Sequence, residues 1–246
     1  MMLTGNKTTS TQSQAREQKG ILTIGRTHIV AEEFRTLVAS QVGDGISVDA
    51  TSYNNPFKRA VHPELYRAVF IIIDSPQAFV ESITLIEALR ANNTVSTIFA
   101  VVTGSGTFNK MKCYLAGADY CVKFTNDPKE SAETLSVIFT SPEWLNNDTL
   151  LLDPTRMCLI GNGKKLDVSF AEMKILEAFS QTRSLILSHD EIARVMGLNI
   201  NFYDPRALEK SISRLRGKIK GLYGTNAIQS IRGYGYRLIR GLISAS

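Results

Sequence analysis

The sequence predicts an α/β fold: a doubly wound, five-stranded parallel sheet, followed by a smaller domain of helices and short strands. From residue 20 to 139, β-branched apolar runs alternate with amphipathic stretches, which is typical of a parallel sheet covered by helices. After residue 150 the pattern changes to short segments, three amphipathic stretches and a final hairpin. At roughly 150 residues per domain, a chain of 246 residues is expected to hold two domains.

Short apolar runs are the expected strands of the first domain. The runs at 68–74 (AVFIIID) and 97–103 (TIFAVVT) have the composition of strands buried on both faces. Ligands in such sheets bind at the carboxyl ends of the strands. The expected strands are 20–25, 46–51, 68–74, 97–103 and 119–123. The expected helices are 29–40, 78–91, 107–116 and 128–139.

The second domain is expected to begin with small antiparallel strands, because turn signals at 153–154 and 161–163 separate short apolar segments. Two capping boxes follow, Ser169 with Glu172 and Ser188 with Glu191. In a capping box, the serine and the glutamate satisfy the free backbone N–H groups where a helix starts. Two of them so close together predict a helix–turn–helix.

The third expected helix starts at Pro205 or Arg206 and runs to about Lys220. At 3.6 residues per turn, its apolar residues fall on one stripe and its polar residues on another. The apolar stripe holds Leu208, Ile212, Leu215 and Ile219, and the polar stripe holds Arg206, Lys210, Ser211, Arg214 and Lys218. A basic stripe opposite an apolar one is what a helix needs to enter the DNA major groove.

Charge is distributed unevenly along the chain. The formal net charge is +5, but the last 41 residues, from Arg206, hold nine basic side chains and one acidic. This asymmetry favours a polyanion as partner of the second domain. A solvated basic face is the alternative, although such faces usually mix both signs of charge.

The segment 228–238 (IQSIRGYGYRL) has the pattern of a β-hairpin that carries arginine near its tip. Gly233 and Gly235 allow a tight turn, and Arg232 would protrude from it. An arginine on a thin arm can enter a narrow minor groove, where the negative potential is concentrated. Arg237 and Arg240 are expected to add phosphate contacts.

The second domain is expected over residues 150–243, and residues 150–240 resemble the winged-helix effector domain of OmpR/PhoB-type response regulators. The matching segments are LLLDP, VSFAEMKILEAF, SHDEIARVMG, DPRALEKSISRLRGKI and IRGYGYRL. The resemblance implies that Lys210, Ser211 and Arg214 face bases. It further implies phosphate contacts or packing for Arg206 and Arg216, and contact with RNA polymerase by the loop 197–205. The full set of DNA-binding residues expected is Arg206, Lys210, Ser211, Arg214, Arg216, Lys218, Arg232, Tyr234 and Arg237.

Given this effector domain, residues 20–139 resemble a receiver domain. Asp74 matches the aspartate that accepts a phosphoryl group, Thr103 the switch hydroxyl, and Lys123 approximately the lysine that pairs with the phosphoryl group. The acidic pair that holds Mg²⁺ in this family is replaced by Gly25 and Arg26. Since Mg²⁺ requires oxygen ligands, we expect no metal site and no ordinary phosphorylation.

We expect Arg26 to pair with Asp74 and hold one fixed conformation. Two alternatives stay open: Asp74 is an inherited residue without a present role, or it is phosphorylated as in a conventional two-component response regulator. The resemblance also implies a homodimer through the receiver-like domain, although Thr134 and Ile138 replace two arginines of the usual ionic contact.

The remaining expectations concern the ends of the chain and its class. Residues 1–19 are polar and are expected to form a disordered tail without a signal peptide, and 140–149 to form a linker. The sequence has three cysteines and no CxxC motif, which favours a reducing, cytoplasmic location. Cys113 and Cys121 are either core filler or a redox pair. Neither a Walker loop nor a GxSxG motif occurs, so we expect a transcription regulator and not an enzyme, with no cofactor.

Overall fold

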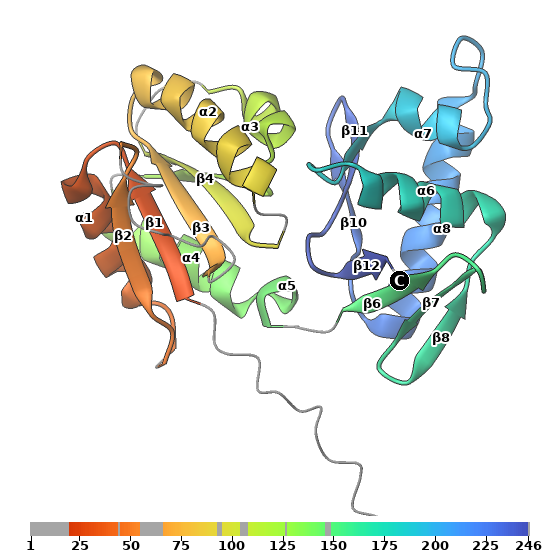
Figure 1. Cartoon of the computed structure of the whole chain (residues 1–246), viewed down its shortest axis with the longest axis horizontal. Coiled ribbons are helices and arrows are strands. Elements are labelled where there is room, and N and C mark those ends of the chain that lie inside the picture. Colours follow the sequence, from red (N-terminus) through yellow and green to blue (C-terminus); the bar gives the residue numbers. More distant parts are fainter. Residues whose placement is uncertain are drawn as a thin grey trace, which may run out of the picture.

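The computed structural model describes residues 20–43, 45–54, 66–92, 95–103, 108–125, 127–145 and 149–245. It contains two domains that lie side by side, an N-terminal α/β domain and a C-terminal domain of helices and small sheets (Figure 1). The expected disordered tail, residues 1–19, lies outside the described residues. Within those ranges, no helix combines the length and the apolar character needed to cross a membrane.

The N-terminal domain is built on a five-stranded parallel sheet with the strand order β2-β1-β3-β4-β5. This order confirms the doubly wound sheet predicted from the sequence. Its central strand β3 is buried along six consecutive residues, as the continuous apolar run required. The strands are β1 (Gly20–Gly25), β2 (Val48–Ser52), β3 (Tyr66–Ile73), β4 (Thr97–Thr103) and β5 (Tyr120–Phe124).

Helices cover both faces of this sheet. The helices α2 (Pro76–Asn92) and α3 (Lys110–Ala116) pack on the face that carries Ile71 and Ile98. The helices α1 (His28–Ala39) and α4 (Pro128–Thr140) pack on the opposite face, against Phe70 and Phe99. Alternate residues of the same strands therefore belong to two separate cores, because side chains of a strand point to opposite faces.

Cys113 lies in the core between the sheet and α3 and is fully buried. Cys121 is half-buried beside it, and both are free thiols. A hydrogen bond with Cys121 lowers the pKa of the Cys113 thiol. The burial agrees with the interpretation of Cys113 as core filler.

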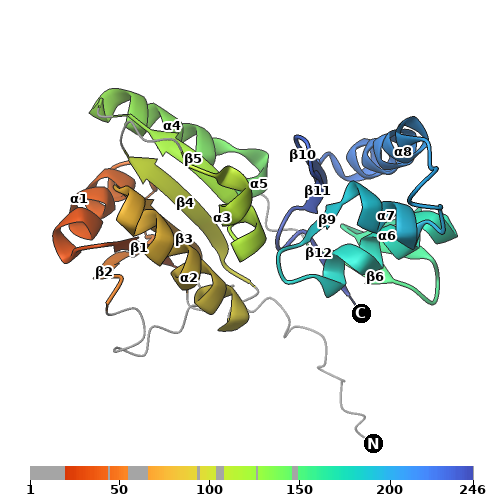
Figure 2. The same cartoon turned by 90° about the horizontal axis from the view of Figure 1, so that it is seen from above.

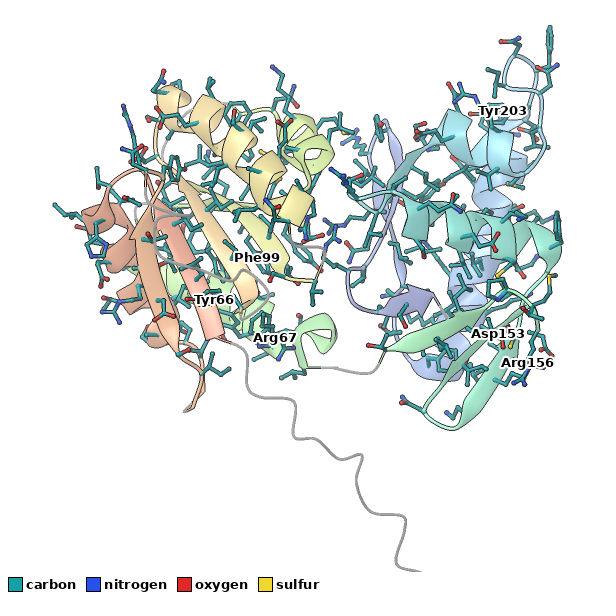
Figure 3. All side chains as sticks on the ribbon, in the orientation of Figure 1. Tyr66, Arg67, Phe99, Asp153, Arg156 and Tyr203 are labelled. Carbon is teal, nitrogen blue, oxygen red and sulfur yellow. The ribbon has the colours of Figure 1, made fainter. Side chains whose placement is uncertain are left out.

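The segment 140–149 contains the short helix α5 (Pro142–Leu145), where the sequence predicted only a linker. Trp144 is buried against Phe139, with ring centroids 4.9 Å apart, and Arg67 lies over the indole ring at 4.2 Å. Figure 3 shows Arg67 beside this helix. The helix α5 therefore packs on the N-terminal domain through the Trp144 side chain.

The C-terminal domain begins with the antiparallel strands β6 (Leu150–Asp153), β7 (Cys158–Gly161) and β8 (Lys164–Asp167). Both predicted capping boxes are present, at the starts of α6 (Phe170–Gln181) and α7 (His189–Val195). The third helix is α8 (Pro205–Tyr223), and the hairpin is β10 (Ile228–Ile231) with β11 (Gly235–Leu238). This is a winged-helix domain in which β10 and β11 form the wing.

Two strands of the C-terminal domain were missed by the sequence analysis. The strand β9 (Ile186–Ser188) pairs with β11, and β12 (Ile243–Ala245) pairs in parallel with β6. Each has three residues, and each depends on a partner that is distant in the sequence. Periodicity cannot detect so short a strand.

The two domains touch through the α3–β5 side of the first and the wing of the second (Figures 1 and 2). The Asp119 carboxylate accepts hydrogen bonds from Arg90 Nη2 at 2.7 Å and from Arg240 Nε at 2.8 Å. The side chains of all three residues are at most 8% exposed. Burial lowers the pKa of Arg90 to about 10, and the Asp119 carboxylate opposes this effect. One carboxylate thus joins an arginine of each domain.

Candidate functional site

The helix α8 begins and ends with the residues that helix termini require. The Asp204 carboxylate accepts a hydrogen bond from the Arg206 backbone N–H at 3.0 Å, and Pro205 occupies the first turn. Gly224 ends the helix with a φ of 73°, a left-handed conformation that favours glycine. The start of α8, which carries the first predicted DNA-binding residue, is therefore fixed by local chemistry.

The two faces of α8 separate as predicted. Its apolar residues are fully or almost fully buried in the core of the C-terminal domain, while Arg206, Lys210 and Arg214 are exposed. Ser211 is half-buried, and its hydroxyl donates to the Ala207 carbonyl at 3.0 Å. Three cations spaced four residues apart thus lie on one exposed stripe of the helix. The buried residues are Leu208, Ile212, Leu215 and Ile219.

Two other predicted DNA-binding residues of α8 are engaged within the domain. Arg216 Nη2 donates to the Ser230 hydroxyl at 2.9 Å, and its guanidinium lies 5.1 Å from the ring centroid of Tyr236. Burial lowers the pKa of Arg216. Lys218 Nζ forms an ion pair with Glu172 at 2.7 Å. These two cations tie α8 to the wing and to α6.

The wing presents Arg232 at its turn. Arg232 and Gly233 are exposed, and Tyr234 is half-buried. Gly233 has a φ of 74°, and a Cβ on Gly235 would lie only 2.1 Å from the Leu187 carbonyl oxygen in β9. Glycine is therefore required at the two positions for different reasons: Gly233 adopts the left-handed conformation of the turn, and Gly235 allows the close approach of β9.

Arg237 does not belong to the exposed basic surface. It is only 8% exposed, and it lies 4.4 Å from the ring centroid of Tyr120 and 5.4 Å from that of Tyr114. Its Nε and Nη2 both donate to the Gln229 side-chain oxygen, at 3.2 Å and 2.6 Å. The sequence placed Arg237 among the phosphate contacts, but in this structure it packs against the N-terminal domain.

The receiver-like residues gather at the carboxyl edge of the five-stranded sheet. The strand register pairs Ile73 with Val102 and Val102 with Lys123. Asp74 follows β3 directly, so this register brings it to the same edge as Thr103 and Lys123. Asp74 and Lys123 are exposed, and Thr103 is half-buried.

The expected pairing of Arg26 with Asp74 is wrong in this structure. Arg26 Nε lies 3.8 Å from Glu81 Oε2 in α2, whereas Asp74 Oδ1 accepts a hydrogen bond from the Ser75 hydroxyl at 3.1 Å. Both side chains of the Arg26–Glu81 pair are well exposed, so the pair is weak. The sequence could not distinguish the two acids, because α2 brings Glu81 to the edge only after folding.

The residues at this edge do not fit the Mg²⁺ that the receiver fold implies. A Cβ on Gly25 would lie 2.8 Å from the Ala31 backbone nitrogen and 3.0 Å from the Thr27 carbonyl oxygen. A carboxylate side chain has no room there without a backbone shift, and the next residue is the cation Arg26. Among the described residues, no group of three or more His, Cys, Asp or Glu side chains is arranged to hold a metal ion.

Tyr53 belongs to this edge and was missed by the sequence analysis. It follows β2, and its hydroxyl donates a hydrogen bond to the Ile72 carbonyl of β3. Burial raises the pKa of the Tyr53 hydroxyl, and the nearby Asp74 and Glu81 carboxylates raise it further. No local pattern marks such a residue, because its partner belongs to a strand that is not adjacent to β2 in the sheet.

Comparisons with known proteins agree with this geometry. A family model described as "Transcriptional regulatory protein, C terminal" matches residues 163–238. The transcriptional regulatory protein PcoR of Escherichia coli is 25% identical over 178 residues, which cover 68% of this chain and 76% of PcoR. CpxR of Escherichia coli K12 is 24% identical over 184 residues, which cover 69% of this chain and 78% of CpxR. Both relatives are named as transcriptional regulatory proteins.

Solved structures also match this chain, at low identity and low TM-score. The DNA-binding domain of E. coli CadC covers 39% of this chain and 90% of its own, with 23% identity and a TM-score of 0.34. The response regulator DrrB of Thermotoga maritima, described as an OmpR/PhoB homologue, covers 89% of this chain and 98% of its own, with 15% identity and a TM-score of 0.37.

Proposed function

We propose that the chain is a transcriptional response regulator whose helix α8 and wing bind specific DNA sequences without Mg²⁺-dependent phosphorylation of Asp74. The observation that carries the DNA-binding surface is the exposed stripe of Arg206, Lys210 and Arg214 opposite a fully buried apolar stripe. Arginine and lysine on such a stripe reach guanine edges and phosphates in the major groove. Arg232, exposed at the wing, reaches the minor groove.

The DNA-binding proposal is tested by selecting genomic fragments bound to the purified chain at about 0.15 M salt. Selected fragments should share a sequence motif. Binding should weaken about five- to 150-fold in Arg214→Ala if this arginine contacts a base. Selection without any common motif would contradict sequence-specific binding.

Independence from phosphorylation is supported by the two residues that replace the acidic pair. The space around Gly25 excludes a carboxylate side chain, and Arg26 puts a cation beside that position. Without a metal, charge on a transferring phosphoryl group has little to neutralise it. We therefore expect acetyl phosphate with Mg²⁺ to leave the intact mass and the DNA affinity of the chain unchanged.

A conventional switch at Asp74 is the second candidate. It is favoured by the exposure of Asp74 at the same sheet edge as Thr103 and Lys123. In that case, mass spectrometry would show a phosphoryl adduct that is absent from Asp74→Ala, and DNA binding would strengthen only in the unsubstituted chain. This result would overturn the first proposal.

The loop between α7 and α8 is proposed to contact RNA polymerase. Phe202 in this loop is 86% exposed and Ile200 is 38% exposed, although apolar side chains of this size are usually buried. Figure 3 shows the neighbouring Tyr203 where this loop projects from the domain. Phe202→Ala should reduce transcription from a bound promoter while DNA affinity stays unchanged.

We also propose a homodimer that forms through the N-terminal domain. Part of the α3–β5 surface is covered by the wing, because Tyr114 and Tyr120 contact Arg237. Val137 on α4 is 70% exposed and remains available for a second copy. Light scattering at increasing concentration should show a dimer that Val137→Asp weakens, and a chain that stays monomeric would contradict the proposal.

A further inference from the structure

A cavity of about 950 Å³ lies between the wing and the start of α3. This volume is within the range of roughly 300–1,000 Å³ found for small-molecule sites. Both domains line the cavity, and three of the lining residues are the cations Lys110, Arg232 and Arg237. None of the described residues that line it is acidic. The site therefore has the charge to receive an anion.

Arg237 is the buried cation of this cavity, and one of its donors lacks a partner. Its Nε and Nη2 are satisfied by Gln229, but Nη1 is buried without a hydrogen bond to any described residue. A buried donor left unsatisfied is destabilising, and more so when it is charged. Nη1 is covered by protein atoms, so an anion in the cavity would meet the positive charge of the Arg237 guanidinium and not this donor.

The other two cations come from opposite walls. Lys110 begins α3 in the N-terminal domain and is exposed, with its Nζ 5.9 Å from the ring centroid of Phe108. Arg232 comes from the wing of the C-terminal domain. Phe108 and Tyr114 add aromatic surface to the lining. The cavity thus combines positive charge with flat apolar walls.

We propose that this cavity binds a phosphate-bearing small molecule, whose phosphate is held by Arg237, Lys110 and Arg232. A small molecule fits better than a DNA phosphate, because both domains wall the cavity. The bound molecule would bridge the two domains and stabilise their contact.

The expected effect on DNA affinity rests on the proposed function, whereas the binding of the phosphate-bearing molecule to the cavity does not. Arg232 is a predicted minor-groove contact, so a molecule that holds it against α3 would compete with DNA. A ligand that binds only while the wing contacts the N-terminal domain, and that is present at ten times its dissociation constant, should weaken DNA binding by up to about tenfold.

The binding is tested by calorimetry on the full chain, with inorganic pyrophosphate and ADP as probes, at about 0.15 M ionic strength without Mg²⁺. At least one probe should bind with one site per chain. Lys110→Gln should weaken binding about tenfold or more, because a charge-assisted hydrogen bond is lost. Lys112→Gln is the matched control: Lys112 is exposed on the same helix and does not line the cavity.

Three outcomes would overturn the proposal: neither probe binds below about 1 mM, both lysine variants weaken binding equally, or Lys110→Gln has no effect. Arg237→Gln is a second test, interpreted only if its thermal unfolding matches the unsubstituted chain. Loss of probe binding in this folded variant supports the site.

A DNA-binding measurement distinguishes failure of the proposed function from failure of the proposed small-molecule site. With a selected fragment, saturating pyrophosphate should weaken DNA binding in the unsubstituted chain but not in Lys110→Gln. If DNA does not bind under any condition, the proposed function fails while the calorimetry still decides the site. If no probe binds but Lys110→Gln loses DNA affinity, the cavity accepts DNA phosphate and the small-molecule site is wrong.

Discussion

Asp119→Asn should strongly destabilise the N-terminal domain. The Asp119 carboxylate accepts hydrogen bonds from Arg90 at 2.7 Å, from Arg240 at 2.8 Å and from the Ile98 backbone N–H at 2.8 Å. The asparagine keeps the volume and one acceptor oxygen but removes the negative charge between two guanidinium groups. The Arg90 side chain is only 2% exposed and that of Arg240 only 4%.

The expected magnitude follows from that burial. Removing one partner of a buried ion pair costs about 3–5 kcal/mol, because a charge is left without compensation. The stability of a domain is only about 5–15 kcal/mol. The transition of the N-terminal domain should therefore shift by about 6 °C or more, since 1 kcal/mol corresponds to roughly 2–8 °C for domains of this size.

Thermal and guanidinium unfolding followed by circular dichroism measures this effect. Glu133→Gln is the control, because it removes an exposed carboxylate from α4 of the same domain and should change stability by less than about 0.5 kcal/mol. If Asp119→Asn also changes the free energy of unfolding by less than about 0.5 kcal/mol, the buried carboxylate does not stabilise the domain and the reasoning is refuted.

Three further predictions concern the C-terminal domain. Arg214→Ala should reduce the affinity for a selected fragment while Lys129→Ala in α4 does not, as measured by fluorescence anisotropy; equal losses would indicate unspecific charge attraction. Gly235→Ala should destabilise the wing, because its Cβ would clash with a backbone carbonyl of β9, and a melting temperature within about 1 °C of the original would contradict this. Burial alone would raise the pKa of Glu172, but the hydrogen bonds from Lys218 and Ser169 outweigh it and leave the pKa below its ordinary value of 4.5. The stability that Glu172 contributes is therefore complete above about pH 4.5 and is lost as the pH falls below it. Urea unfolding of Glu172→Gln should differ from that of the unsubstituted chain at pH 7 and converge with it toward pH 3; a constant difference would refute the linkage.

The sequence by itself determined the features that depend on near neighbours in the chain. Three features each depend on a stretch of no more than about twenty residues: the buried apolar run of β3, the capping boxes, and the amphipathic pattern of α8. Hydrophobic periodicity and helix capping act over that range, so the elements and the exposed stripe of Arg206, Lys210 and Arg214 could be predicted. The turn at Gly233 has the same local origin.

Only the tertiary structure decided which charges meet. Arg240 pairs with Asp119 across 121 positions of the chain, Arg26 pairs with Glu81 and not with Asp74, and Arg237 is buried on Tyr120. These contacts depend on how helices and domains pack, and several partners of the right charge are available to each arginine in the sequence. A residue's type therefore predicts the interaction it can make, while the fold selects the partner that is within a few ångströms of it.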